Sequence, residues 1–361
     1  MDPSERIVPY QSFERGAYHT PNRRLVRRVL GRTITKLGAE VGQLTFVLNL
    51  FLGNANRTCE SVNVESWAAS DFLLALRLRV SLTSFIGIPE VRQMLRDTFP
   101  KPRLTEKREL LAPPLTKNYS LVATAFDYLL RFQLQYTNPQ VAIAGPWVAE
   151  DAVHLLGKNA ASGRKSKKIT TQARERLAVF LQTGHLTDDL LESALLLAGL
   201  DPIVRGNRGQ EYVGQVSRDD IEDLRCQIRL VDLSLLRAKE LCLLNPVFAA
   251  SRLVGGADGD LVIDDTLMDI KCTKTLELKR DHFNQLIGYY ALYKISGIAN
   301  LTSQPQINNL AIYFSRYGYL YSLEVEQVIN PLTFPAFVRW FQTRAESDRR
   351  STRRSSNKQV P

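Results

Sequence analysis

The feature that most constrains the fold is a pair of short apolar segments, residues 259–263 and 267–273, separated by a polar turn sequence. Each segment has the length of a β-strand and is bounded by turn-forming residues, which is typical of strands. Asp264 and Asp265 are placed to form a two-residue hairpin turn between them. The chain is therefore expected to contain a β-hairpin with one face in a core.

A two-residue turn fixes which residues of the hairpin face each other. Ile263 then lies opposite Thr266, and Asp260 lies opposite Asp269. A three-residue turn would put Leu261 opposite Asp269, but the two-residue register is favoured because it collects an unbroken apolar face for the core. Side chains alternate along strands. One face then carries Asp260, Val262, Leu267, Asp269 and Lys271, and the wholly apolar face carries Leu261, Ile263, Met268, Ile270 and Cys272.

The opposed carboxylates suggest chemistry. Directly opposed residues have Cβ atoms about 4.5–5.5 Å apart, and like charges at that separation destabilise a sheet. A divalent cation between Asp260 and Asp269 would remove that cost, and Mg²⁺ typically binds one or two carboxylates while keeping several waters. The ammonium of Lys271 could orient an attacking water or neutralise charge on a phosphorane. The pattern predicts phosphodiester hydrolysis; the alternative is a surface hairpin with an Asp–Lys ion pair.

This pattern resembles the RecB-like branch of the PD-(D/E)XK nuclease superfamily. Three ordered elements carry the resemblance: Gly259-Asp260, then Asp269-Ile270-Lys271, then a helix with Gln285 and Tyr289 on one face. Each element is common by chance, but the ordered set is more specific. The resemblance implies hydrolysis of DNA with Mg²⁺ or Mn²⁺. The residues implied to be catalytic are Asp260, Asp269, Lys271, Gln285 and Tyr289.

The same branch places a metal-binding residue on an earlier helix, in the pattern Gly-x-x-x-His/Asp. Residues 123–127 resemble it, with Ala123 in place of the glycine and Asp127 as the candidate ligand. Glu222 and Glu240 are rivals for this role, and Asp127 could equally be an ordinary surface acid. The metal ligands implied are thus Asp127, Asp260 and Asp269.

The rest of the chain predicts an α/β fold. Helices are expected at 121–136, 185–200, 219–241, 281–295 and 334–345. A strand is expected at 242–248, and the segment 309–325 is β-rich with Gly318 as a turn signal. The resemblance implies a restriction-endonuclease-like core, with a mixed central sheet flanked by helices. The expected organisation is a mainly helical N-terminal region (1–115), the nuclease core (116–345) with a helical insertion at about 139–215, and a basic disordered tail (346–361).

The charge balance favours a polyanionic partner. The chain has 47 Lys and Arg against 37 Asp and Glu, a formal net charge of +10. Residues 157–177 open as a Gly- and Ser-rich sequence, which predicts a mobile loop over a phosphate backbone, although a plain exposed loop fits equally well. The candidate nucleic-acid-binding residues in this segment are Arg164, Lys165, Lys167 and Lys168.

Other features exclude several classes of protein. The four cysteines form no CxxC pair, so zinc ribbons and thioredoxin-like sites are not expected. No Cys follows Cys272, which argues against the iron–sulfur cluster of some members of the branch. No secretory signal or membrane-length apolar run is present, so a cytoplasmic protein is expected. A catalytically silent nuclease fold that binds nucleic acid or regulates is the rival function. RNA as substrate, and a homo-oligomer or larger complex, stay open.

Overall fold

A computed structural model of the chain describes residues 81–157, 160–204 and 216–357. Residues 1–80, most of the predicted helical N-terminal region, lie outside the described residues. The helices are α4 Leu82–Gly87, α5 Pro89–Thr98, α6 Tyr119–Thr137, α7 Val148–Leu155, α8 Ala161–Thr183, α9 Asp188–Ala198, α10 Asp201–Val204, α11 Arg218–Ile228, α12 Arg280–Ser296, α13 Val325–Val328 and α14 Phe334–Asn357, with 3-10 turns η3 Leu233–Leu236, η4 Ser251–Val254 and η5 Ser315–Tyr317.

The described strands form one mixed, six-stranded sheet in the order β1-β2-β3-β4-β5-β6. They are β1 Ala142–Ala144, β2 Cys242–Leu244, β3 Leu261–Ile263, β4 Thr266–Lys271, β5 Asn309–Phe314 and β6 Tyr319–Glu324. The pairs β1–β2 and β4–β5 are parallel, and the other three neighbouring pairs are antiparallel. The predicted α/β class with a mixed sheet is confirmed.

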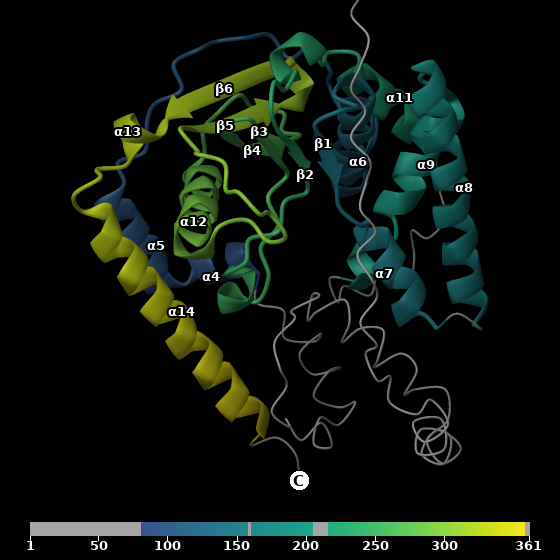
Figure 1. Cartoon of the computed structure of the whole chain (residues 1–361). Coiled ribbons are helices and arrows are strands. Elements are labelled where there is room, and N and C mark those ends of the chain that lie inside the picture. Colours follow the sequence, from purple (N-terminus) through teal and green to yellow (C-terminus); the bar gives the residue numbers. More distant parts are fainter. Residues whose placement is uncertain (1–80, 158–159, 205–215, 358–361) are drawn as a thin grey trace, which may run out of the picture. The chain divides into compact units, whose positions relative to one another are not determined.

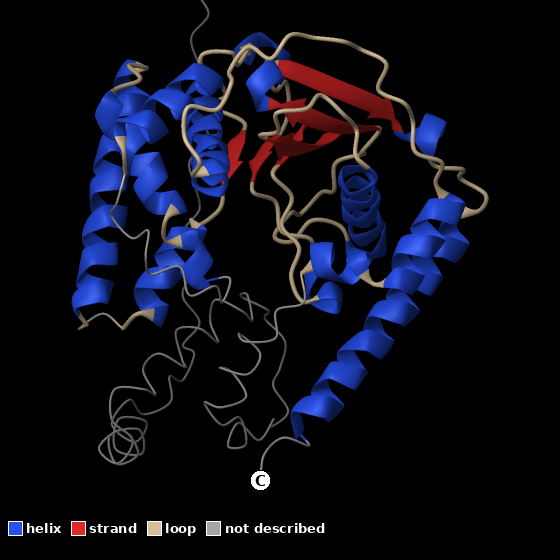
Figure 2. Ribbon diagram, turned by 180° about the vertical axis from the view of Figure 1, so that it is seen from behind, coloured by secondary structure: helices blue, strands red, loops and turns tan. Residues whose placement is uncertain are grey.

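Helices cover both faces of this sheet (Figures 1 and 2). One face packs against α4, α5, α12 and α14 in a core that includes Val262 and Leu267. The other packs against α6, α9 and α11 in a core that includes Leu261 and Met268. Both faces of the hairpin are therefore buried, whereas the sequence indicated a core on only one of them. The reason is that Val262 and Leu267 alternate with the acidic residues and cover the second face.

Several local expectations were wrong. The segment predicted as a loop bearing Arg164 is the start of helix α8, and its small residues Gly163 and Ser166 are buried. Residues 219–241 form a helix only to Ile228, followed by the 3-10 turn η3. Helix α14 extends through the basic tail to Asn357, so the described part of that tail is helical. The strand predicted over 242–248 is limited to Cys242–Leu244.

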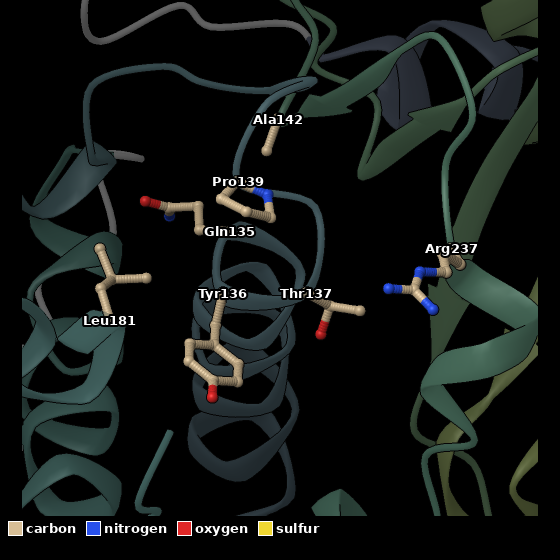
Figure 3. Close-up of a pocket in the computed structure, with 7 residues that line it drawn as sticks. All are labelled: Gln135, Tyr136, Thr137, Pro139, Ala142, Leu181 and Arg237. Atoms are coloured by element: carbon tan, nitrogen blue, oxygen red, sulfur yellow. The ribbon is translucent and has the colours of Figure 1, made fainter. Parts of the chain in front are cut away.

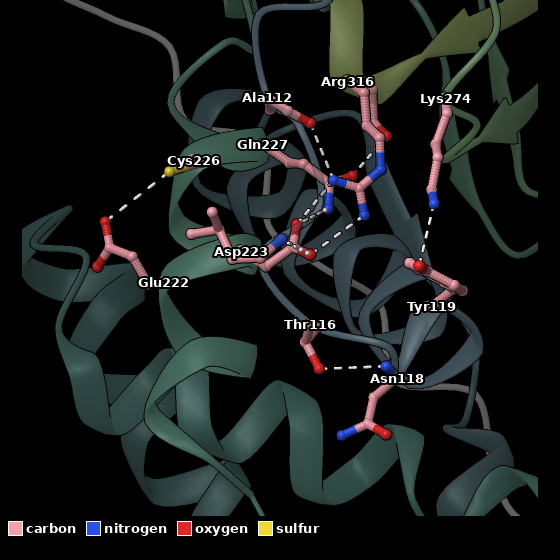
Figure 4. Close-up of polar contacts among 12 residues, drawn as sticks. Ala112, Thr116, Asn118, Tyr119, Glu222, Asp223, Cys226, Gln227, Lys274 and Arg316 are labelled. Atoms are coloured by element: carbon pink, nitrogen blue, oxygen red, sulfur yellow. Dashed lines mark hydrogen bonds and ion pairs between the residues drawn. The ribbon is translucent and has the colours of Figure 1, made fainter.

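A buried ion pair joins distant segments around the turn between β5 and β6 (Figure 4). Arg316 is 1% exposed, and its Nη1 lies 2.8 Å from Oδ1 of Asp223 on α11, which is fully buried. The same Nη1 donates to the carbonyl of Ala112, and the amide of Leu115 donates to Asp223 Oδ2 at 3.1 Å. The segment before α6 is thereby anchored to the turn after β5. Among the described residues, no helix has both the length and the apolar character needed to cross a membrane.

Candidate active site

The hairpin has the predicted two-residue register. Ile263 pairs with Thr266, and Leu261 pairs with Met268, so the next opposed pair beyond β3 is Asp260 and Asp269. Asp264 adopts a positive φ of 50° in the turn. Its carboxylate accepts hydrogen bonds from the amides of residues 239, 240 and 241, which stabilises the turn. The turn lies at the end of the hairpin away from Asp260.

Lys271 joins the end of β4 to helix α12. Its Nζ lies 2.5 Å from Asp269 Oδ2 and donates a hydrogen bond of 3.1 Å to Gln285 Oε1. Gln285 Nε2 in turn donates to the hydroxyl of Tyr289 at 2.7 Å. The Tyr289 ring stacks on Phe248, with centroids 5.4 Å apart. The residues singled out in two separate sequence motifs therefore form one connected polar cluster.

Asp260 is held at the edge of this cluster by backbone contacts. Its Oδ2 accepts a 2.6 Å hydrogen bond from the amide of Ile270, on the neighbouring strand. The preceding residue, Gly259, is buried, and a Cβ there would lie 3.3 Å from Cγ of Pro246. The glycine thus allows the chain to pass close to Pro246 as it enters the hairpin. This gives a packing reason for the Gly-Asp pair.

Burial dominates the charge state of the cluster. Asp269 is 1% exposed, and burial raises its pKa to about 7, opposed by Lys271 and assisted by Asp260. Burial alone would lower the pKa of Lys271, but the carboxylates of Asp269 and Asp260 raise it above its ordinary value. Lys271 is therefore a cation at neutral pH. Asp269, with a pKa of about 7, gains or loses its proton near neutral pH.

Helix α6 brings a third carboxylate into electrostatic range of the hairpin. Burial raises the pKa of Asp127 to about 7, Arg131 opposes this shift, and Asp260 contributes to it. Arg131 forms an ion pair with Asp127 Oδ2 and donates from Nε to the Asp127 carbonyl at 3.2 Å. Asp127 Oδ1 is buried and accepts no hydrogen bond from any residue that the structure describes. Arg131 was missed at the sequence level, although its i,i+4 spacing from Asp127 is a recognisable ion-pair signal.

The two rivals of Asp127 lie in other settings. Glu222 pairs with Arg225 one turn along α11 and accepts a 3.8 Å contact from the Cys226 thiol. Glu240 donates its amide to Asp264, so it lies beside the hairpin turn. The length of β3 separates that turn from Asp260. Asp127 is close enough to Asp260 that the charge of Asp260 raises its pKa, so Asp127 is the best candidate of the three acids.

His282 lies in the first turn of α12, three residues before Gln285 and seven before Tyr289, so all three share one side of the helix. Burial, together with the positive charge of Lys271, lowers the pKa of His282 to about 4. Its Nδ1 is buried and has no hydrogen-bond partner among the described side chains and backbone. A neutral imidazole therefore borders the cluster.

The predicted basic residues lie elsewhere. Helix α8 packs mainly on α7 and α9, and its first turns carry the exposed side chains of Arg164, Lys165, Lys167 and Lys168. They form a basic helix surface and not a loop over the hairpin.

Within the described part of the chain, no group of three or more His, Cys, Asp or Glu side chains is arranged to hold a metal ion. The candidate ligand Asp260 is close enough to contribute to the raised pKa of both Asp269 and Asp127. Comparisons of the chain with protein-family models, curated proteins and solved structures found no match.

Proposed function

We propose that this chain is a metal-dependent nuclease that hydrolyses phosphodiester bonds in DNA, on a restriction-endonuclease-like core. The observation that carries the proposal is the connected cluster of Asp269, Lys271, Gln285 and Tyr289. These residues belong to two sequence motifs that are separate along the chain. A surface hairpin with an incidental ion pair would give no reason for Lys271 to reach a second motif on α12.

The donor set suits a hard divalent cation such as Mg²⁺ or Mn²⁺, which prefers carboxylate oxygens. Asp260 and Asp269 would hold it, with Asp127 as the third ligand. Asp127 Oδ1 is buried without a hydrogen-bond donor among the described residues, as expected of an oxygen that serves a cation. When bound, such a cation would lower the pKa of water and polarise the phosphoryl oxygen.

Lys271 supplies the fixed positive charge of the site. Gln285 accepts a hydrogen bond from its ammonium, and Tyr289 accepts one from the Gln285 amide, so the ammonium is oriented before substrate binds. A preorganised cation stabilises the negative charge that grows on the phosphoryl oxygens as water attacks and the ester oxygen leaves. Because its pKa is raised, Lys271 acts as a cation and not as the base.

Two observations favour the rival function, a silent nuclease fold that binds nucleic acid. No three-ligand group is formed by the described residues, and the Lys271 ammonium contacts one of the candidate ligands. In a silent protein this ion pair would be permanent. In a nuclease, the cation would compete with Lys271 for Asp269.

The deciding experiment is cleavage of labelled linear and circular DNA by the purified full-length protein, with Mg²⁺, Mn²⁺ or EDTA. Metal-dependent products that vanish with Asp269→Asn would support the proposal. DNA binding without cleavage under every metal condition would favour the silent alternative. RNA of the same sequence, run in parallel, distinguishes the two nucleic acids.

A further inference from the structure

Helix α6 carries a polar stripe that leads away from the carboxylates. Asp127, Arg131 and Gln135 are spaced four residues apart, so they follow one another along one side of the helix. Arg131 is 6% exposed and pairs with Asp127, and its guanidinium lies 4.6 Å from the centre of the Tyr128 ring. The stripe runs toward the C-terminal end of α6, where the chain turns into β1.

The sheet register brings β1 to the same edge as Asp260. Ala144 pairs with Leu244 on β2, and the amide of the next residue, Asn245, donates to the Asp260 carbonyl at 2.9 Å. Gly145 therefore follows β1 at the level of Asp260, about two strand spacings away. The edge strand and the α6 stripe thus both lead to the proposed active site.

A hollow lies along this path. Beside Gly145 a pocket of only about 10 Å³, room for about one water, is lined by Arg131, Phe132, Gln135, Ala144, Gly145, Trp147 and Leu244. Gln135 also lines a larger open groove of about 670 Å³ (Figure 3), together with Tyr136, Thr137, Pro139, Ala142, Leu181 and Arg237. In Figure 3 the guanidinium of Arg237 points toward Thr137 at the end of α6. Since Gln135 is shared, the two hollows adjoin.

The lining of the larger groove has the chemistry of a polyanion site. It contains the exposed side chain of Arg237 and no acidic side chain among the described residues, whereas Arg131 in the small pocket already pairs with Asp127. Tyr136 lines the groove and is 43% exposed, and its ring also packs against Phe180, with ring centroids 5.4 Å apart. Single-stranded nucleic acids bind to surfaces that combine cations for the phosphates with aromatic rings on which unpaired bases stack.

We propose that this groove, between the C-terminal half of α6, strand β1 and helix α8, binds one unpaired strand of a polynucleotide. The strand runs past Gln135 toward the edge of the sheet that carries the carboxylates, so the inference rests on the proposed function for its direction. Arg237 contacts a phosphate, and Tyr136 stacks on a base. Base-paired DNA does not present free base faces, so the groove selects single-stranded segments or ends.

The test is the affinity of the full-length protein for fluorescein-labelled oligothymidylate of about 12 nucleotides, measured by anisotropy in EDTA. Gln135→Glu places a carboxylate in the groove with little change in size, and like charges across an interface are strongly unfavourable. The dissociation constant should rise at least about tenfold. Gln182→Glu is the matched control, because Gln182 is exposed on α8 beside Leu181 but does not line the groove.

Tyr136→Leu and Arg237→Ala provide independent tests of stacking and phosphate contact, each with a melting curve to confirm folding. Each should weaken oligothymidylate binding about tenfold, and duplex binding less. An equal loss with Gln182→Glu, or unchanged affinity in all three groove variants, would overturn the proposal. So would a dimer that the Gln135→Glu variant disrupts, because the groove would then be an interface between two copies.

The two proposals fail separately. EDTA prevents metal-dependent cleavage during the binding assay. If the groove binds oligothymidylate, the groove proposal is therefore supported even if no metal condition gives cleavage products. Cleavage that depends on Asp269, together with groove variants that bind oligothymidylate normally, would support the nuclease proposal and contradict the groove proposal.

Discussion

Lys271 is the residue at which the structure and the proposed chemistry meet. The side chain is 17% exposed, so it is shielded from water yet accessible to a bound phosphate. It contacts Asp269 and Gln285 at once, which keeps the ammonium from moving freely. Such preorganisation is effective in catalysis because the charge need not reorient as the reaction proceeds.

Lys271→Ala should reduce cleavage by about 10²–10³ while leaving much of the DNA affinity. The carboxylates would still bind the cation, so the defect is in the rate. The measurements are the cleavage rate, DNA affinity and melting temperature of the same preparation, with Lys279→Ala as control because Lys279 is exposed just before α12. A well-folded Lys271→Ala protein that cleaves DNA at the wild-type rate would contradict the assignment of the active site to this cluster.

Asp269 predicts a pH dependence of stability. Its pKa rises from 3.8 to about 7 on folding, so between these values the folded protein binds more protons than the unfolded chain. The contribution of Asp269 to stability is therefore fully present below pH 3.8 and is lost as pH rises through about 7. Without added metal, the free energy of unfolding of Asp269→Asn should rise relative to that of the wild type between pH 5 and pH 8. The expected rise is at least about 1.4 kcal/mol, equivalent to one pKa unit. Chemical denaturation at both pH values measures this, and a constant difference would contradict it.

The sequence was informative about the hairpin residues because one turn and strict alternation determine the pairing of Asp260 with Asp269. It was not informative about Arg131, because the ion pair with Asp127 gains its importance from burial on the sheet. Burial depends on which helices cover each face, and alternation within one strand does not contain that information. The raised pKa of Asp269 has the same origin.

At the level of elements, the ion pair of Asp223 and Arg316 holds α11 to the turn after β5. Both side chains are nearly inaccessible, so removing one partner leaves a buried charge. Asp223→Ala should destabilise the fold by about 3–5 kcal/mol. Asp223→Leu combined with Arg316→Met should recover much of that stability, because no unpaired charge remains. Urea denaturation of the three proteins decides this, and a double variant as unstable as Asp223→Ala would show that the charge is not the cause.

Element prediction succeeded for long amphipathic helices and for the hairpin, and failed where composition misled. Gly163 and Ser166 suggested a loop, but in α8 they are buried small residues where the helix packs closely. Strand β1 was not foreseen, since three residues without alternation give no periodic signal. Its place is set by pairing with β2, which is distant in the sequence.

At the level of the whole molecule, the basic C-terminus predicts salt-sensitive DNA binding. Residues 349–361 carry five basic side chains and follow Ala345, which is buried, and Asp348, which pairs with Arg344. Truncation after Asp348 should weaken DNA binding and reduce the slope of log affinity against log salt by about 0.9 for each phosphate that the shortened protein no longer neutralises. A full-length variant with the five residues changed to Gln is the control for length. An unchanged slope in both would show that these charges do not bind DNA.

The hydrogen bond from the Ile270 amide to Asp260 also makes the backbone a spectroscopic reporter of the site. The nitrogen and proton resonances of this one amide should respond to any change in charge on the carboxylate that it contacts. Titrating ¹⁵N-labelled protein with Mg²⁺ should therefore shift the Ile270 cross-peak before peaks of the α8 surface, and Asp269→Asn should weaken that response. A peak that stays fixed while metal saturates the protein would place the cation away from Asp260. The nuclease proposal can thus be examined in the resting protein, before any substrate is added.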